Sequence, residues 1–175
     1  MSKKVEGGKM IDKKYTNLLE ELRKIKLMDS SLENEDEKRE EIENKINKYE
    51  KIAYELSNCT DCSIIPYMCS IVEDNATELS AVEYLVRMIF KIVQKDKENG
   101  MRQLIKGSMV MIPQGEDQVI NMYIAIIRDN VLRQCYKKNI ERANSKEKIF
   151  ARKIIKRIKD DFGDTLDVSD ILELI

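Results

Sequence analysis

The sequence predicts an all-α protein, an irregular multi-helix bundle of about seven to eight helices that begins with an N-terminal helical hairpin. Three observations predict this fold class. Apolar residues recur every three or four positions along most of the chain, the spacing that places them on one face of a helix. Charged residues make up 36% of the 175 residues, which suits helices with one apolar and one charged face. Only 6 glycines and 2 prolines are present, fewer turn residues than a sheet-rich fold of this length normally needs.

The N-terminal part is expected to form a lead-in and a helical hairpin. Residues 1–9 are polar and contain two adjacent glycines, which indicates a disordered lead-in. Helical spacing then predicts one helix over residues 11–27 and a second over residues 33–56. The second helix has an acidic first half and a thin apolar stripe, so we expect residues 10–57 to pair as a hairpin. The same stripe would also suit pairing between two copies in a homodimer.

Residues 58–175 are expected to form a helical core domain. A short helical segment is predicted over residues 61–72. The helix that follows, over residues 77–95, is the most apolar of the chain, and we interpret it as the central core helix. The pair Asn99-Gly100 is typical of the position just after a helix, so it is read as a stop signal.

The segment over residues 101–112 is ambiguous. It begins with helical spacing, but Gly107 interrupts the pattern, and residues 109–112 are the one place where an extended strand would be tolerated. Residues 113–115 are expected to form a turn that opens the next helix. The free backbone N–H groups at that helix start are a candidate anion site, although a plain helix start explains the same residues.

Three helices are predicted in the C-terminal part. Apolar residues at helical spacing indicate the first over residues 116–139, the second over residues 145–162 and a short last helix over residues 167–174. Gly163 follows the second of these helices directly, where a left-handed glycine often ends a helix.

Composition bears on the function. The chain has no histidine, which removes Ser-His-Asp and Cys-His catalysis and histidine-ligated metals together. We therefore expect no enzymatic activity, no cofactor and no small-molecule substrate. No apolar run approaches the roughly 18 residues that span a bilayer, and the N-terminus lacks a signal-peptide pattern. With only 4 cysteines, too few for a disulfide framework, an intracellular location in the cytoplasm or nucleus is expected.

The four cysteines are candidate ligands for a zinc ion. Cys59 and Cys62 form a C-x-x-C pair, Cys69 follows, and Cys135 is remote. Four thiolates can hold zinc, but a closed site normally uses two such pairs, and the chain has one. We favour ordinary buried thiols over a zinc site and assign no metal ligand.

A basic stretch toward the C-terminus is the strongest local signal. Between residues 133 and 159 basic residues greatly outnumber acidic ones, and on the helix over residues 145–162 they recur at helical spacing. Such a face can neutralise phosphates or dock an acidic protein surface. Alternatively, it is a solvated face that is balanced by acidic residues of the fold itself, from the block 33–43 or the tail 160–173. The candidate binding residues are Lys148, Arg152, Lys153, Lys156, Arg157 and Lys159.

The predicted function is therefore that of a non-enzymatic helical binding or assembly module acting through protein–protein contacts. A protein partner or self-association is expected, and no membrane. The alternative is a nucleic-acid-associated protein that uses the basic face of the helix over residues 145–162. Few aromatic residues accompany those cations, which disfavours binding of single strands by base stacking.

Overall fold

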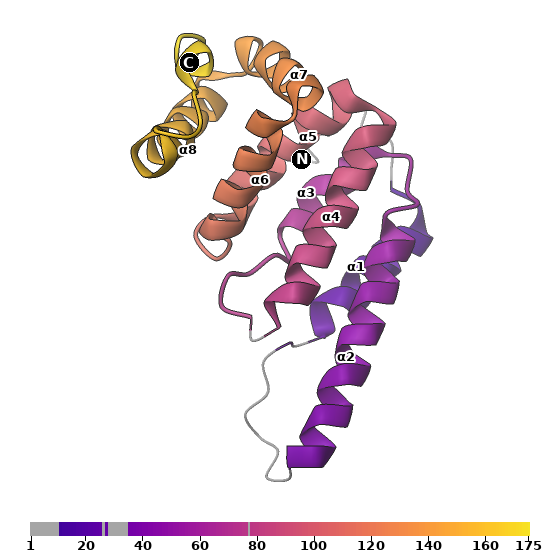
Figure 1. The fold of residues 1–175 in the computed structure, drawn as a ribbon. Coiled ribbons are helices and arrows are strands. Elements are labelled where there is room, and N and C mark those ends of the chain that lie inside the picture. The colour runs from indigo at the N-terminus through magenta and orange to yellow at the C-terminus, as the bar shows by residue number, and fades with distance from the viewer. Residues whose placement is uncertain (1–10, 26, 28–34, 77) are drawn as a thin grey trace, which may run out of the picture.

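The computed structural model describes residues 11–25, 27, 35–76 and 78–175, and the side chains of residues 35–38 are outside this description (Figure 1). The described residues form nine α-helices and one 3-10 helix and contain no strand, so the predicted all-α bundle is confirmed. The predicted lead-in over residues 1–9 lies outside the described residues.

The first two helices form the predicted hairpin. Helix α1 spans Lys13–Lys24 and is capped by Asp12, whose carboxylate accepts a hydrogen bond from the backbone N–H of Lys14. Helix α2 spans Glu35–Leu56 and packs against both α1 and α4. In Figure 1 the N-terminal half of α2, which is the acidic half, extends beyond the body of the bundle.

The middle of the chain holds a 3-10 helix over Cys62–Ile64, α3 over Ile65–Cys69 and α4 over Leu79–Lys95. Buried residues line α4 along its length, among them Leu85, Ile89 and Ile92, which are fully buried. Helix α4 contacts α2, α3, α5 and α6, as expected of a central core helix.

Helix α5 corrects two predictions. It spans Lys97–Met111 without a break, so the expected stop at Asn99-Gly100 and the tolerated strand over residues 109–112 are both wrong. The two glycines serve close packing between helices instead. A methyl group at Gly100 would lie 2.6 Å from Val93 Cα, and one at Gly107 would lie 2.6 Å from Cys69 Sγ. Glycine is present at these positions because a neighbouring helix leaves no room for a side chain.

The single helix predicted over residues 116–139 is two helices, α6 over Glu116–Arg128 and α7 over Asn130–Glu141. The break falls at Asp129, whose backbone is extended and whose carboxylate accepts hydrogen bonds of 2.9 Å from the N–H groups of Val131 and Leu132. Asp129 thus caps a new helix. The apolar spacing continues across this cap, which is why it predicted a single helix.

The last two helices are α8 over Ser145–Phe162, which matches the predicted range, and α9 over Ser169–Leu172. Gly163 follows α8 as predicted, but its φ of −58° is right-handed, so the expected left-handed glycine is wrong. One cluster of buried apolar side chains runs from Leu19 in α1 to Ile175. Because the hairpin packs into this shared core, the division of the chain at residue 57 stays a prediction. Within the described residues, no helix is both long and apolar enough to span a bilayer.

Candidate binding surface on the basic helix

Helix α8 presents its basic residues around a buried apolar face. Ala151, Ile154, Ile155 and Ile158 point into the core. The helix starts at a capping box, in which the Asn144 side chain accepts the N–H of Glu147 and the Glu147 carboxylate accepts the N–H of Asn144, both within 3.1 Å. The apolar face therefore fixes how α8 is rotated, and the rotation decides where each cation lies.

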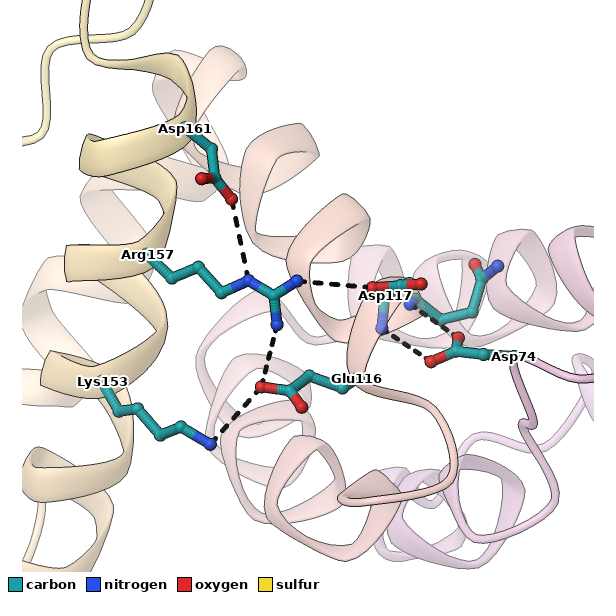
Figure 2. Close-up of polar contacts among 7 residues, drawn as sticks. Asp74, Glu116, Asp117, Lys153, Arg157 and Asp161 are labelled. Atoms are coloured by element: carbon teal, nitrogen blue, oxygen red, sulfur yellow. Dashed lines mark hydrogen bonds and ion pairs between the residues drawn. The ribbon is translucent and has the colours of Figure 1, made fainter.

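Two of the six candidate residues, Lys153 and Arg157, are held by the protein's own carboxylates (Figure 2). Arg157 Nη1 lies 3.1 Å and Lys153 Nζ lies 3.4 Å from the same oxygen, Oε1 of Glu116. Arg157 also lies 3.7 Å from Asp117 and 3.7 Å from Asp161. These cations join α8 to the start of α6, which leaves them less available to an outside anion.

The start of α6 is in turn held by Asp74, from the segment between α3 and α4 (Figure 2). Its carboxylate accepts hydrogen bonds from the backbone N–H groups of Asp117 at 2.7 Å and Gln118 at 3.0 Å. The candidate anion site at this helix start is therefore occupied by an anion of the chain itself. The carboxylate also interacts favourably with the positive end of the helix dipole.

Among the other four candidate residues, one contacts another part of the chain and three do not. Lys148 donates a hydrogen bond of 3.3 Å to the backbone oxygen of Leu174. Arg152, Lys156 and Lys159 are exposed and form no ion pair or hydrogen bond with any described residue. Three of the six predicted binding residues therefore have no partner among the described residues, and the binding role of all six stays a prediction.

An exposed aliphatic side chain lies among them. Ile149 is 70% exposed, the most exposed of the large apolar residues that the structure describes. Arg152 and Lys156 follow it at three and seven positions, so all three share the outward face of α8. Ile149, Arg152, Lys156 and Lys159 together form the outer face of α8.

Two of the three basic residues of α7 are likewise paired with a carboxylate. Arg133 and Lys137 both contact the carboxylate of Asp170 in α9, with Lys137 Nζ at 2.9 Å. Burial raises the pKa of Asp170, but the hydrogen bonds from Arg133 and Lys137 outweigh this effect and hold the pKa below its ordinary value. Part of the acidic tail therefore balances α7. The acidic half of α2 forms no ion pair with α8 among the described residues, and Figure 1 places the two at opposite ends of the molecule.

The four cysteines are free thiols, and three of them, Cys59, Cys62 and Cys69, are buried. Burial raises the pKa of each, and that of Cys69 reaches about 12. Such thiols are poor nucleophiles at neutral pH, because the reactive species is the thiolate. In the part of the chain that the structure describes, no group of three or more His, Cys, Asp or Glu residues is arranged to hold a metal ion.

The sequence interpretation missed Asp74, Glu116 and Asp117 as partners of the basic helix and its neighbour. Glu116 and Asp117 stand in the first turn of α6, where acidic residues are common because they complement the helix dipole. That local signal explains their presence at a helix start. It does not indicate that the folded chain brings α8 alongside them.

Comparisons with protein-family models, with curated proteins and with solved structures gave no match to this chain.

Proposed function

We propose that this chain is a non-enzymatic assembly module whose outer face of α8 docks the acidic half of α2 from a second copy. The observation that carries the proposal is the exposure of Ile149 beside the unpaired Arg152 and Lys156. An aliphatic side chain within a cationic surface gains from contact with another protein. It gains little from a phosphate backbone, which offers only charge there.

The acidic half of α2 has the complementary chemistry. Residues 35–43 contain six carboxylates and two basic residues. Glu40 and Glu43 are exposed, and the half-buried Ile42 and Ile46 provide apolar surface on the same helix. Complementary charges of this kind set partner choice and orientation more than they add affinity.

Geometry favours contact between copies over contact within one. The acidic half of α2 and the outer face of α8 lie at opposite ends of the molecule in Figure 1, so one chain does not bring them together. Two different surfaces that meet in this way can pair reciprocally in a two-fold dimer or join head-to-tail in a ring or chain.

The test is the solution mass of the full chain as a function of concentration and salt. At low ionic strength we expect the mass to rise above the monomer value of 20.5 kDa with concentration, and to return toward it in high salt. Arg152→Glu combined with Lys156→Glu should leave the protein monomeric. A wild-type protein that stays monomeric at every concentration in low salt would overturn the proposal.

The matched control is Lys13→Glu combined with Lys138→Glu. Both lysines are exposed, lie on α1 and α7, and form no ion pair with a described residue. The control changes the net charge by the same amount, so it should assemble like the wild type. Equal loss of assembly in both double variants would show that net charge, and not the outer face of α8, governs the effect.

A second candidate function is nucleic-acid binding, favoured by the helical spacing of the free cations Arg152, Lys156 and Lys159. Three phosphate contacts would give a shallow dependence of affinity on salt, since the slope scales with the number of neutralised phosphates. Anisotropy of a labelled duplex at two salt concentrations, with the Arg152→Glu and Lys156→Glu variant alongside, tests this candidate. The net charge of −1 supplies no general attraction to nucleic acid.

An intracellular setting, in the cytoplasm or nucleus, is part of the proposal. Four free thiols, three of them buried, support a reducing compartment, where cysteines stay unpaired. Mass analysis of the protein after alkylation in unfractionated cells tests this point, because alkylation at all four cysteines after unfolding is expected, and a disulfide would contradict it.

A further inference from the structure

A second cationic region lies away from the outer face of α8, in a pocket of about 360 Å³ where α5, the end of α7 and the start of α8 meet. Three basic side chains line it, against a single acidic one. We call it the junction pocket. Its polar lining residues are Arg102, Lys106, Asn139, Arg142, Asn144 and Glu147.

Two of the cations are unengaged. Arg102 and Lys106 stand one turn apart on α5, both are exposed, and neither pairs with a described residue. Residues four apart on a helix project to the same side, so both charges border one volume. Unpaired like charges held next to each other repel, and an anion between them removes that repulsion.

The third cation is only lightly held. Arg142, the C-cap of α7, lies 3.0 Å from Glu98, but both side chains are more than half exposed, at 64% and 58%. Exposed ion pairs of this kind contribute about 0–1 kcal/mol. A doubly charged ligand in the pocket would therefore compete well for the Arg142 guanidinium, whose planar fork matches phosphate oxygens.

Hydrogen bonds hold the remaining polar groups of the junction pocket in place. Asn139 is only 7% exposed, and its amide nitrogen donates 3.0 Å to the backbone oxygen of Cys135, which fixes its orientation. The one carboxylate, Glu147, accepts the N–H of Asn144 at 3.0 Å as part of the capping box at the start of α8. The lining residues thus carry three positive charges and one negative charge, and Glu98 neutralises Arg142 until a ligand displaces it.

We propose that the junction pocket binds the phosphoryl group of a small phosphomonoester. A dianion balances two net positive charges where a single carboxylate does not. The volume is at the lower end of the roughly 300–1,000 Å³ typical of ligand sites, which fits a phosphoryl group with a small substituent. This function goes beyond docking at α8 and uses none of the residues of its outer face.

The test is titration of the full chain with inorganic phosphate and, separately, with a nucleoside monophosphate, followed by amide NMR shifts. Saturable shifts at Arg142, Asn144 and Glu147 are expected with both ligands, and tighter binding of the nucleotide would show that the substituent is also held. Affinity should be greater at pH 8 than at pH 5 for both ligands, because the second ionisation of the phosphoryl group, which has a pKa of about 6 in a monoester, creates the dianion. No saturable shift at millimolar phosphate would overturn the proposal.

Variants locate the site. Arg102→Gln combined with Lys106→Gln should weaken phosphate binding by about tenfold or more, since each lost charged hydrogen bond is worth about 1.5–3 kcal/mol. Lys13→Gln combined with Lys51→Gln removes the same charge from exposed, unpaired positions on α1 and the C-terminal half of α2, outside both the junction pocket and the outer face of α8, and should leave the affinity unchanged. Equal weakening in both variants would contradict a built site, as would an oligonucleotide that binds this pocket more tightly than the nucleotide.

Discussion

Arg157 and Glu116 face each other across the gap between α8 and α6, with Nη1 and Oε1 3.1 Å apart. The Glu116 side chain is 28% exposed and accepts Lys153 through the same oxygen, so one carboxylate pairs with two cations. This relationship separates two of the basic residues of α8 from the three cations of its outer face. Lys153 and Arg157 join α8 to α6. Arg152, Lys156 and Lys159 form no pair with a described residue.

The shared carboxylate predicts coupled effects on stability. Glu116→Gln should lower the free energy of unfolding by about 1 kcal/mol or less, because these pairs are partly exposed. Arg157→Gln should cost a similar amount, and the double variant should cost less than the sum of the two, since each single change already breaks the contact. Urea unfolding at low and high salt measures all three. Strict additivity in low salt would mean that the contact contributes nothing.

The cap that Asp74 supplies to α6 predicts a larger effect. Asp74→Ala removes the acceptor of two backbone N–H groups at a helix start, and losses of about 0.5–2 kcal/mol are typical of such caps. Asp74→Asn keeps an oxygen acceptor and should retain much of the stability. Thermal or urea unfolding of both variants checks this. An alanine variant as stable as the wild type would show that water replaces the carboxylate without cost.

The close approach of α3 to α5 predicts that Gly107→Ala is destabilising. Alanine normally gains about 1 kcal/mol over glycine inside a helix. At this position the added methyl group would lie 2.6 Å from Cys69 Sγ and 3.3 Å from Pro66 Cα, and overpacking typically costs about 1–3 kcal/mol. We therefore expect a net loss of stability in urea unfolding. Cys69→Ala in the same chain should relieve part of the clash, and a Gly107→Ala variant more stable than the wild type would refute the packing explanation.

The contacts of Asp170 predict how stability depends on pH. The pKa of Asp170 is lowered in the folded protein, so the ionised carboxylate favours folding above its unfolded pKa of about 4. That contribution is lost as pH falls below this value and the carboxylate takes up a proton. Asp170→Asn should therefore lose less stability between pH 5 and pH 3 than the wild type does. Because the side chain is 39% exposed, salt should shrink the difference. Identical pH profiles would contradict the assignment.

Much of the fold follows from local patterns. The limits of α8 were predictable because Asn144 and Glu147 form a capping box at one end and Gly163 marks the other. The helix break predicted at Gly107 was wrong, because glycine at this position allows close contact with Cys69, a residue distant in sequence. Asp129 could have been recognised as a cap, since it precedes Asn130 and interrupts an otherwise continuous helical pattern.

The binding surface was only partly predictable, for a related reason. Composition identifies the cations of α8, but whether a cation is free depends on which carboxylate the fold brings to it. Lys153 and Arg157 look the same in the sequence as Arg152 and Lys156, and only the position of Glu116 separates the two pairs. The junction pocket was not predictable for the same reason, because only the packing of α5 against α7 brings Arg102 and Arg142 together.

The most direct test of the central claim is complementation between two charge-reversed chains. One carries Arg152→Glu and Lys156→Glu on α8, and the other carries Glu40→Lys and Glu43→Lys on α2. The first variant alone opposes carboxylates on α8 to carboxylates on α2, and the second opposes the cations of α8 to lysines at two exposed positions of α2, so each alone should remain monomeric in low salt. In an equimolar mixture the changed positions of one chain meet the opposite charge on the other. We predict that the mixture regains the mass of the wild-type assembly, and a mixture that stays monomeric while the wild type assembles would contradict docking of α2 on α8.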